Sequence, residues 1–160
     1  MKAIRTGTRI LGALLLLSCA LVASAQALPY DEQADAQHEL ESALGTARAA
    51  NKRILIIFGA NWCEDCRALD RALHGEALGP VIDAHYVVVK VDVGHFDKNL
   101  AFARLYGKPI AKGIPSVVVV TPKNEIVYET RAGELADARR MGSAAIGSFF
   151  RELSERPAGY

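Results

Sequence analysis

Cysteine is scarce in this sequence. Cys19, Cys63 and Cys66 are the only three among 160 residues. A small secreted scaffold held together by several disulfides is therefore excluded. A four-ligand zinc or iron–sulfur site is also disfavoured, because there is only one Cys-x-x-Cys motif. The remaining candidate ligands, His74, His85 and His95, are scattered and none has ligand spacing from that motif.

A basic segment is missing outside the N-terminus. Lys2, Arg5 and Arg9 account for three of the 19 basic residues, and the other 16 stand against 18 acidic ones. The chain after residue 25 therefore has a net charge of −2. Nucleic acids and anionic membranes attract proteins with a basic patch, so we expect no nucleic-acid partner.

An apolar run long enough to span a membrane, about 20 residues, is missing as well. The longest run, Ile10–Val22, follows a basic start and precedes small residues. This order is typical of a secretory signal peptide and predicts a signal over 1–25, one exported domain over 26–160, and a periplasmic or otherwise exported location. Two alternatives stay open, lipidation at Cys19 after Leu16-Leu17-Ser18 and an uncleaved anchor.

Half of the residues, 51%, are hydrophobic, which suits a single domain with a substantial core. The periodicity of apolar residues predicts an α-β-α-β-α-β-β-α order. That order favours an α/β fold, with a mixed central sheet of about four to five strands and helices on both faces. Helices are predicted over 35–50, 63–74, 98–106 (capped by Asp97) and 143–153, a short one over 77–84, and strands over 54–58, 86–93, 116–121 and 126–131.

The segment Asn61-Trp-Cys-Glu-Asp-Cys66 follows the first predicted strand. Its two cysteines could be a redox pair, half of a metal site or a structural disulfide. At the first turn of a helix, Cys63 lies beside unpaired N–H groups and the positive end of the helix dipole, which lower the pKa of its thiol. Cys66 lies one turn inward on the apolar face. A redox pair is favoured, with Cys63 attacking and Cys66 resolving the mixed disulfide.

Glu64 and Asp65 stand between the two cysteines. Carboxylates beside a thiolate raise the pKa of the thiol by like-charge repulsion and so oppose the helix-end effect. We expect these acids to tune the pair toward a reductant or an intermediate potential. A strong oxidant owes its power to a very stable thiolate, and that source is weakened here.

Two segments together resemble the signature of the thioredoxin family. They are Gly59-Ala-Asn-Trp-Cys-x-x-Cys-Arg67 and Gly113-Ile114-Pro115-Ser116. The resemblance covers roughly residues 36–155 and implies a thioredoxin-like fold. It is strongest to the exported branch that includes domains receiving electrons from the membrane reductant of the bacterial periplasm.

The resemblance implies roles for further residues. The Ile114–Pro115 bond would be cis, with its loop facing the sulfurs and pairing with an extended substrate strand. Trp62 would flank Cys63 as an apolar platform, although packing in the core is the alternative. No bound cofactor and no metal would be needed. The implied partners are protein or peptide disulfides and a membrane-bound thiol electron donor.

One position departs from the thioredoxin pattern. Ile57 stands where the family usually has a buried acid, six residues before the first cysteine. Lys90 matches the lysine that usually faces that acid. Our hypothesis is that Lys90 lies beneath the pair and favours the thiolate, the alternatives being a solvated lysine or a pair with Asp92.

The sequence thus predicts an exported thiol–disulfide oxidoreductase, a disulfide reductase or isomerase, acting as a monomer. An alternative is a binding module of the same fold, a thiol chaperone or a copper-delivery protein. A third possibility is a reductase dedicated to one client such as apocytochrome c. The irregular segments 107–114 and 133–142 are candidate client-specific surfaces.

Overall fold

The computed structural model describes residues 27–157. The predicted signal segment and Cys19 lie outside these residues, so cleavage, lipidation and anchoring stay predictions. Among residues 27–157, no helix is both long and apolar enough to cross a membrane.

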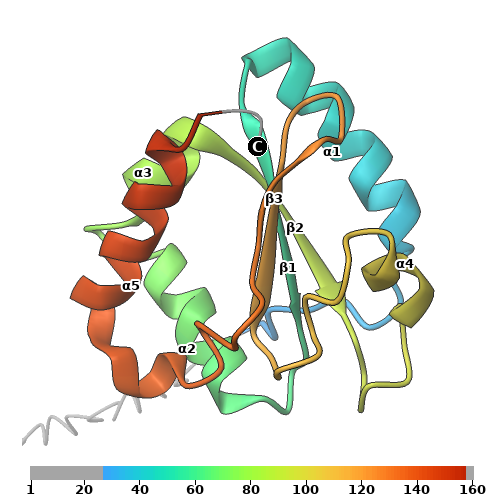
Figure 1. The fold of residues 1–160 in the computed structure, drawn as a ribbon. Coiled ribbons are helices and arrows are strands. Elements are labelled where there is room, and N and C mark those ends of the chain that lie inside the picture. Colours follow the sequence, from blue (N-terminus) through green and yellow to red (C-terminus); the bar gives the residue numbers. More distant parts are fainter. Residues whose placement is uncertain (1–26, 158–160) are drawn as a thin grey trace, which may run out of the picture.

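The described chain forms four strands and five helices around one sheet (Figure 1). The sheet order is β2-β1-β3-β4, in which β1 and β2 are parallel and the other neighbouring pairs are antiparallel. The predicted mixed sheet is thus confirmed with four strands. The elements are α1 (Ala36–Ala50), β1 (Arg53–Gly59), α2 (Glu64–Leu73), α3 (Gly79–His85), β2 (Tyr86–Asp92), α4 (Leu100–Arg104), β3 (Ser116–Val120), β4 (Ile126–Glu129) and α5 (Ala138–Glu155).

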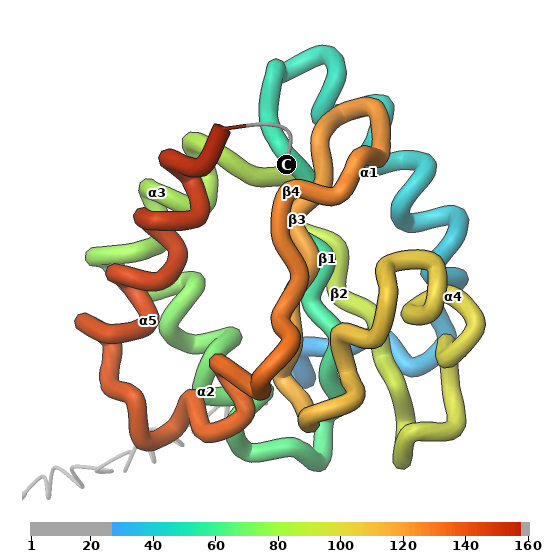
Figure 2. The backbone as a smooth tube through the Cα atoms, in the orientation of Figure 1, coloured from blue at the N-terminus to red at the C-terminus, as the bar shows by residue number. Residues whose placement is uncertain are grey.

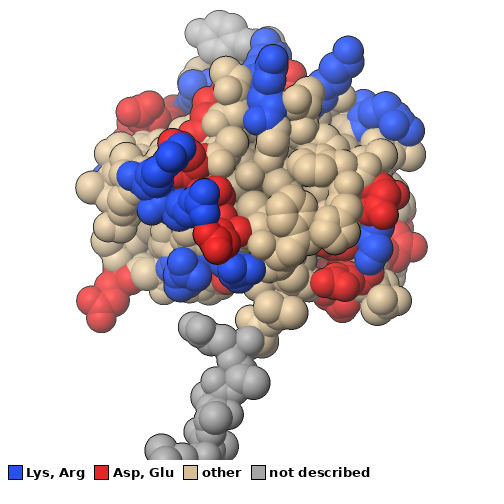
Figure 3. All heavy atoms as spheres, turned by 90° about the horizontal axis from the view of Figure 1, so that it is seen from below, with Lys and Arg blue, Asp and Glu red and all other residues tan. Residues whose placement is uncertain are grey.

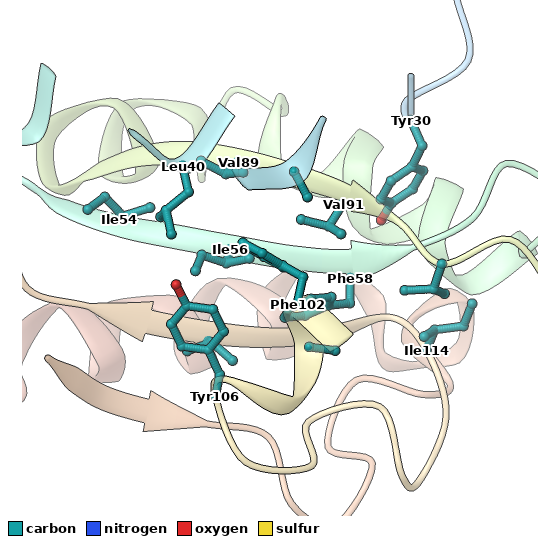
Figure 4. Packing of buried hydrophobic residues seen from close by; sticks show 14 of the residues in the cluster. Tyr30, Leu40, Ile54, Ile56, Phe58, Val89, Val91, Phe102, Tyr106 and Ile114 are labelled. Carbon is teal, nitrogen blue, oxygen red and sulfur yellow. The ribbon is translucent and has the colours of Figure 1, made fainter. Parts of the chain in front are cut away.

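Helices cover both faces of the sheet, with α1 and α4 on one side and α2, α3 and α5 on the other (Figure 1). Successive side chains of a strand point to opposite faces, so β1 supplies both hydrophobic layers. Ile54, Ile56 and Phe58 pack toward α1 and α4, as Figure 4 shows, whereas Leu55 and Ile57 pack toward α2 and α5. The continuous apolar run of β1 is therefore buried on both sides.

Helix α1 agrees closely with its prediction because both ends carry clear signals. The Asp35 carboxylate accepts hydrogen bonds from the N–H groups of Gln37 and His38, which caps the first turn. Asn51 adopts a left-handed conformation (φ 52°) and ends the helix.

Helix α4 is shorter than predicted, and the predicted cap is wrong. Asp97 does not cap it: its carboxylate instead accepts the N–H of His95 at 2.9 Å, inside the preceding loop. Asn99, with φ 51°, is the residue that precedes the first helical turn. Asp side chains that hydrogen-bond to their own local backbone favour turns over helix starts. The loop before α4 is therefore two residues longer than predicted, and the helix begins at Leu100.

Helix α5 begins five residues earlier than predicted and is broken. Gly142 has φ 73° and ψ 157°, outside helical geometry, and separates one turn (Ala138–Met141) from the main helix. The tube in Figure 2 shows this first turn after the chain returns from β4 to pack beside α2. The segment 133–142 is therefore only partly irregular.

Candidate active site

Cys63 and Cys66 are joined as a disulfide at the start of α2, where β1 ends, with their Cα atoms 5.2 Å apart. Cys63 is the N-cap residue, and the N–H of Cys66 lies 3.1 Å from the Cys63 Sγ. A donor aimed at this sulfur would stabilise a thiolate in the reduced protein. Cys63 keeps 6% exposure and Cys66 none. Cys63 is thus nearly enclosed, although it is the more exposed of the two cysteines.

The loop before β3 covers the disulfide. The Ile114–Pro115 peptide bond is cis. The carbonyl oxygen of Ile114 lies 3.7 Å from the Cys63 Sγ, and the Ile114 side chain is buried. Two segments about fifty residues apart thus meet at one sulfur, which explains why Cys63 is largely enclosed.

Trp62 is 48% exposed, so the core-packing alternative is wrong. Its indole N–H donates to the carbonyl of Gly94 at 2.9 Å, and its ring stacks on His95 with the centroids 5.3 Å apart. Phe96, itself 43% exposed, meets the ring edge-on. Figure 3, which views the molecule from below, shows uncharged atoms covering a broad central area with charged side chains on either side.

Arg139, on the first turn of α5, contacts both acids between the cysteines. Its guanidinium forms an ion pair with Glu64, and its Nε lies 3.5 Å from the carboxylate of Asp65. The backbone N–H of Arg139 also donates to Asp65 at 3.0 Å. Glu64 and Asp65 are therefore not isolated charges, as they look in the sequence, because a cation lies against both.

Lys90 pairs with Asp70 of α2, its Nζ lying 2.5 Å from the Oδ1. The predicted alternative of a pair with Asp92 is wrong, since Asp92 lies 3.4 Å from Lys98 instead. Lys90 stands opposite Ile57 in the register of β1 and β2. The acid near this lysine therefore comes from α2, one turn beyond Cys66, and not from β1.

The segment before α1 is part of the site, which the sequence did not predict. Tyr30 donates its N–H to the Asn61 side chain at 3.0 Å, and Asn61 returns a hydrogen bond to the Tyr30 carbonyl at 2.8 Å. The phenol lies against Gly59, where a Cβ would come within 2.2 Å of its oxygen. Burial, with smaller contributions from the Asp70 and Asp92 charges, raises the pKa of Tyr30 far above its usual value.

No cluster of three or more metal-binding side chains occurs among the described residues. The residues that the sequence assigned to the site fall into three groups. Cys63 and Cys66 form the disulfide, with Trp62 directly before it in the chain and the Ile114 carbonyl of the cis-Pro115 loop against Cys63; Glu64 and Asp65 face Arg139; Lys90 contacts α2 through Asp70.

A Cys-x-x-Cys disulfide at a strand–helix junction, facing a cis-proline loop on a mixed α/β sheet, defines a thioredoxin-type redox protein. Comparison with protein families agrees: the thioredoxin-like family model matches residues 35–122, and the chain belongs to this family. Among curated protein sequences, none matches significantly.

Solved structures extend the comparison. A disulphide isomerase from Xylella fastidiosa Temecula1 is 47% identical, with a TM-score of 0.79 over 82% of this chain and 100% of that one. A thioredoxin from Thermus thermophilus is 25% identical, with a TM-score of 0.50 over 71% and 79% of the two chains. A DsbH oxidoreductase, 16% identical with a TM-score of 0.51 over 95% and 96%, shares the fold. The predicted thioredoxin-like fold is confirmed, and oxidoreductase activity is supported in general terms.

Proposed function

We propose that this protein is an exported thiol–disulfide oxidoreductase that reduces or isomerises disulfides in proteins or peptides. The observation that carries the proposal is the position of the Cys63 Sγ, at the N-terminus of α2 and 3.7 Å from the carbonyl before the cis proline. The likeness to a solved disulphide isomerase supports the same class of reaction.

The reaction begins from the reduced pair. The Cys63 thiolate attacks one sulfur of a client disulfide, forming a mixed disulfide, and the other client sulfur leaves as a thiolate. The Cys66 thiolate then attacks the Cys63 sulfur, which releases the second client thiol and leaves the Cys63–Cys66 disulfide. The client gains two electrons and the pair loses two. For isomerisation, another client thiolate attacks the client sulfur of the mixed disulfide before Cys66 attacks Cys63, which forms a new client disulfide and releases the Cys63 thiolate.

The burial of the two sulfurs supports this division of roles. Cys66 is fully buried on the inner side of α2, so a client disulfide reaches Cys63 first. The backbone around Pro115 offers hydrogen-bonding groups beside Cys63 for an extended client segment. Trp62, which directly precedes Cys63, and Phe96, which meets the Trp62 ring edge-on, present exposed apolar surface, which suits unfolded protein segments better than small polar thiols.

Turnover as a reductase requires a supply of electrons. A membrane-bound thiol reductant outside the cytoplasm fits an exported protein, because a dithiol donor can reduce the Cys63–Cys66 disulfide by the same exchange chemistry. The chain's own two sulfurs carry the electrons, so the proposed reaction uses no bound cofactor.

Trapping tests the proposal directly. In the native host, Cys66→Ala should accumulate mixed disulfides between Cys63 and exported cysteine-containing proteins, because resolution is blocked. Cys63→Ala/Cys66→Ala is the matched control and should trap none. A captured set of many clients supports general reduction or isomerisation, and a single client indicates a dedicated reductase. An empty trap would overturn the proposal, and stoichiometric copper binding by the reduced wild type would then favour the copper-delivery alternative.

A further inference from the structure

The two acids between the cysteines are held by one residue from a distant part of the chain. Arg139 pairs with Glu64 through its guanidinium, and it approaches Asp65 both through Nε at 3.5 Å and through its backbone N–H at 3.0 Å. Asp65 is largely covered in this arrangement, with 15% of its side chain exposed, whereas Glu64 is 62% exposed.

The broken start of α5 makes this contact possible. The first N–H groups of a helix have no partner within the helix, and the carboxylate of Asp65 accepts one of them from Arg139. Gly142 adopts a conformation that L side chains rarely take and redirects the chain directly after this turn. The short turn Ala138–Met141 can therefore meet α2 at an angle that a continuous helix would not give.

Other charges surround the thiol pair. Arg67 donates to the carbonyl of Asn61 at 2.6 Å and so faces the loop before Cys63. His95 stacks on Trp62, and Lys112 precedes Ile114 by two residues. Among residues 27–157, Arg139 is the cationic residue that contacts both Glu64 and Asp65.

We propose that Arg139 is a positioning residue for thiol–disulfide exchange. By holding the carboxylates of Glu64 and Asp65, it cancels the repulsion that they would exert on a Cys63 thiolate, and it thereby sets the redox poise of the pair. This inference rests on the proposed function. Glu64 and Asp65 thus anchor the start of α5 to α2, and their electrostatic effect on Cys63 depends on Arg139.

The test measures the ionisation of Cys63 in the reduced protein. The pH dependence of its alkylation rate, with the modified cysteine identified by mass spectrometry, gives the ionisation constant without turnover. Arg139→Ala should lower this constant roughly threefold to tenfold, because two carboxylates lose their counter-charge near the thiolate. At a pH where Cys63 is ionised in both proteins, the reduction potential should fall by about 30 mV for each tenfold change.

Three controls separate charge neutralisation from a structural role. Arg140→Ala removes the neighbouring arginine, which pairs with Asp137, and should leave Cys63 unchanged. Arg139→Lys keeps the charge and should restore most of the wild-type constant. In a Glu64→Gln/Asp65→Asn background, Arg139→Ala should have little further effect if it acts through the two acids.

Two results would overturn the inference. One is an unchanged Cys63 ionisation constant in Arg139→Ala, and the other is an equal shift in the background that lacks both acids. Should Arg139→Ala fail to fold, Arg139→Gln keeps the length and a polar end, and the same loss is expected. If the wild type neither reduces nor rearranges any protein disulfide, the proposed function fails, while the ionisation measurement still decides the role of Arg139.

Discussion

Lys90 on β2 and Asp70 on α2 form an ion pair with 2.5 Å between Nζ and Oδ1, at the position where the sequence leaves the lysine without its expected acid. Each side chain is about one quarter exposed. The pair joins the sheet to the helix that carries both cysteines, so it ties the position of α2 to β2.

Removing the acid alone should cost more than removing both partners. Asp70→Asn leaves the Lys90 ammonium between β2 and α2 without a counter-charge, and we expect the free energy of unfolding to fall by about 1 kcal/mol. Lys90→Met keeps the stem and drops the charge, so its effect should be smaller, and the double variant should resemble Lys90→Met. Urea unfolding of the oxidised protein measures these differences. Equal losses in all three variants would contradict this account.

Gly59→Ala should destabilise the protein because the new methyl group meets the Tyr30 phenol at 2.2 Å. Overpacking of this kind costs about 1–3 kcal/mol, measurable as a lower melting temperature. Gly45→Ala in the middle of α1 is the matched control: apart from the helix's own neighbouring backbone, no atom of the described residues lies within 4 Å of the added Cβ, and the helix should gain about 0.5–1 kcal/mol. Tyr30→Leu should relieve most of the penalty of Gly59→Ala. A full-size penalty in that double variant would show that the clash lies elsewhere.

Phe96→Ser should weaken the reaction with protein clients while leaving small disulfides unaffected. Phe96 is 43% exposed beside Trp62 and has φ 64°, a conformation uncommon for a bulky residue. If client segments cover this ring, its loss should reduce kcat/KM for a protein disulfide roughly threefold to tenfold, from about 1 kcal/mol of lost burial. Leu105→Ser is the control, since Leu105, the residue that follows α4, is 66% exposed. Equal effects of the two variants would mean that Phe96 makes no specific contact.

Tyr86 makes the free energy of unfolding of the protein depend on pH in the alkaline range. Burial raises the pKa of Tyr86 from 10.0 to about 12, and Arg53 opposes this in part. A folded-state pKa above the unfolded one contributes stability that is complete below pH 10 and is lost as pH rises through 12. Tyr86→Phe should therefore flatten part of the decline in unfolding free energy between these values.

The same substitution should not weaken the protein at neutral pH. The Tyr86 hydroxyl is buried and has no hydrogen-bond partner among residues 27–157, so Tyr86→Phe removes an unsatisfied group. Tyr86→Phe and wild type are compared by urea unfolding at pH 7 and at several points from pH 10 to 12. An unchanged slope over the alkaline range would show that Tyr86 does not titrate with folding.

The fold and the cysteine pair could be predicted because their signals are local. The apolar run of β1, the Asp35 cap and the strand–helix context of Cys63 each lie within a few residues. Ile114 and Pro115 are distant from the cysteines, but they belong to a segment that the family resemblance identifies. The prediction that Asp97 caps α4 was wrong because a local turn uses the same carboxylate.

The residues missed by sequence reasoning act only through tertiary contacts. Arg139 reaches Asp65 across 74 positions of sequence, and nothing in the composition of its segment distinguishes it from Arg140. The hydrogen bond between Tyr30 and Asn61 involves the segment before α1, which has no periodic pattern of apolar residues. Of these residues, Asp70 could most easily have been predicted from the sequence, because it follows Cys66 by one helical turn.

The order of the sheet gives the Lys90–Asp70 pair a further consequence. β2 is an edge strand, and its outer backbone groups could in principle pair with a strand from another molecule. A charge carried inward by an edge strand discourages such pairing, because a second strand packed there would bury the ammonium group further. The ion pair that holds α2 in place thus also protects β2 against aggregation through edge-to-edge β-pairing.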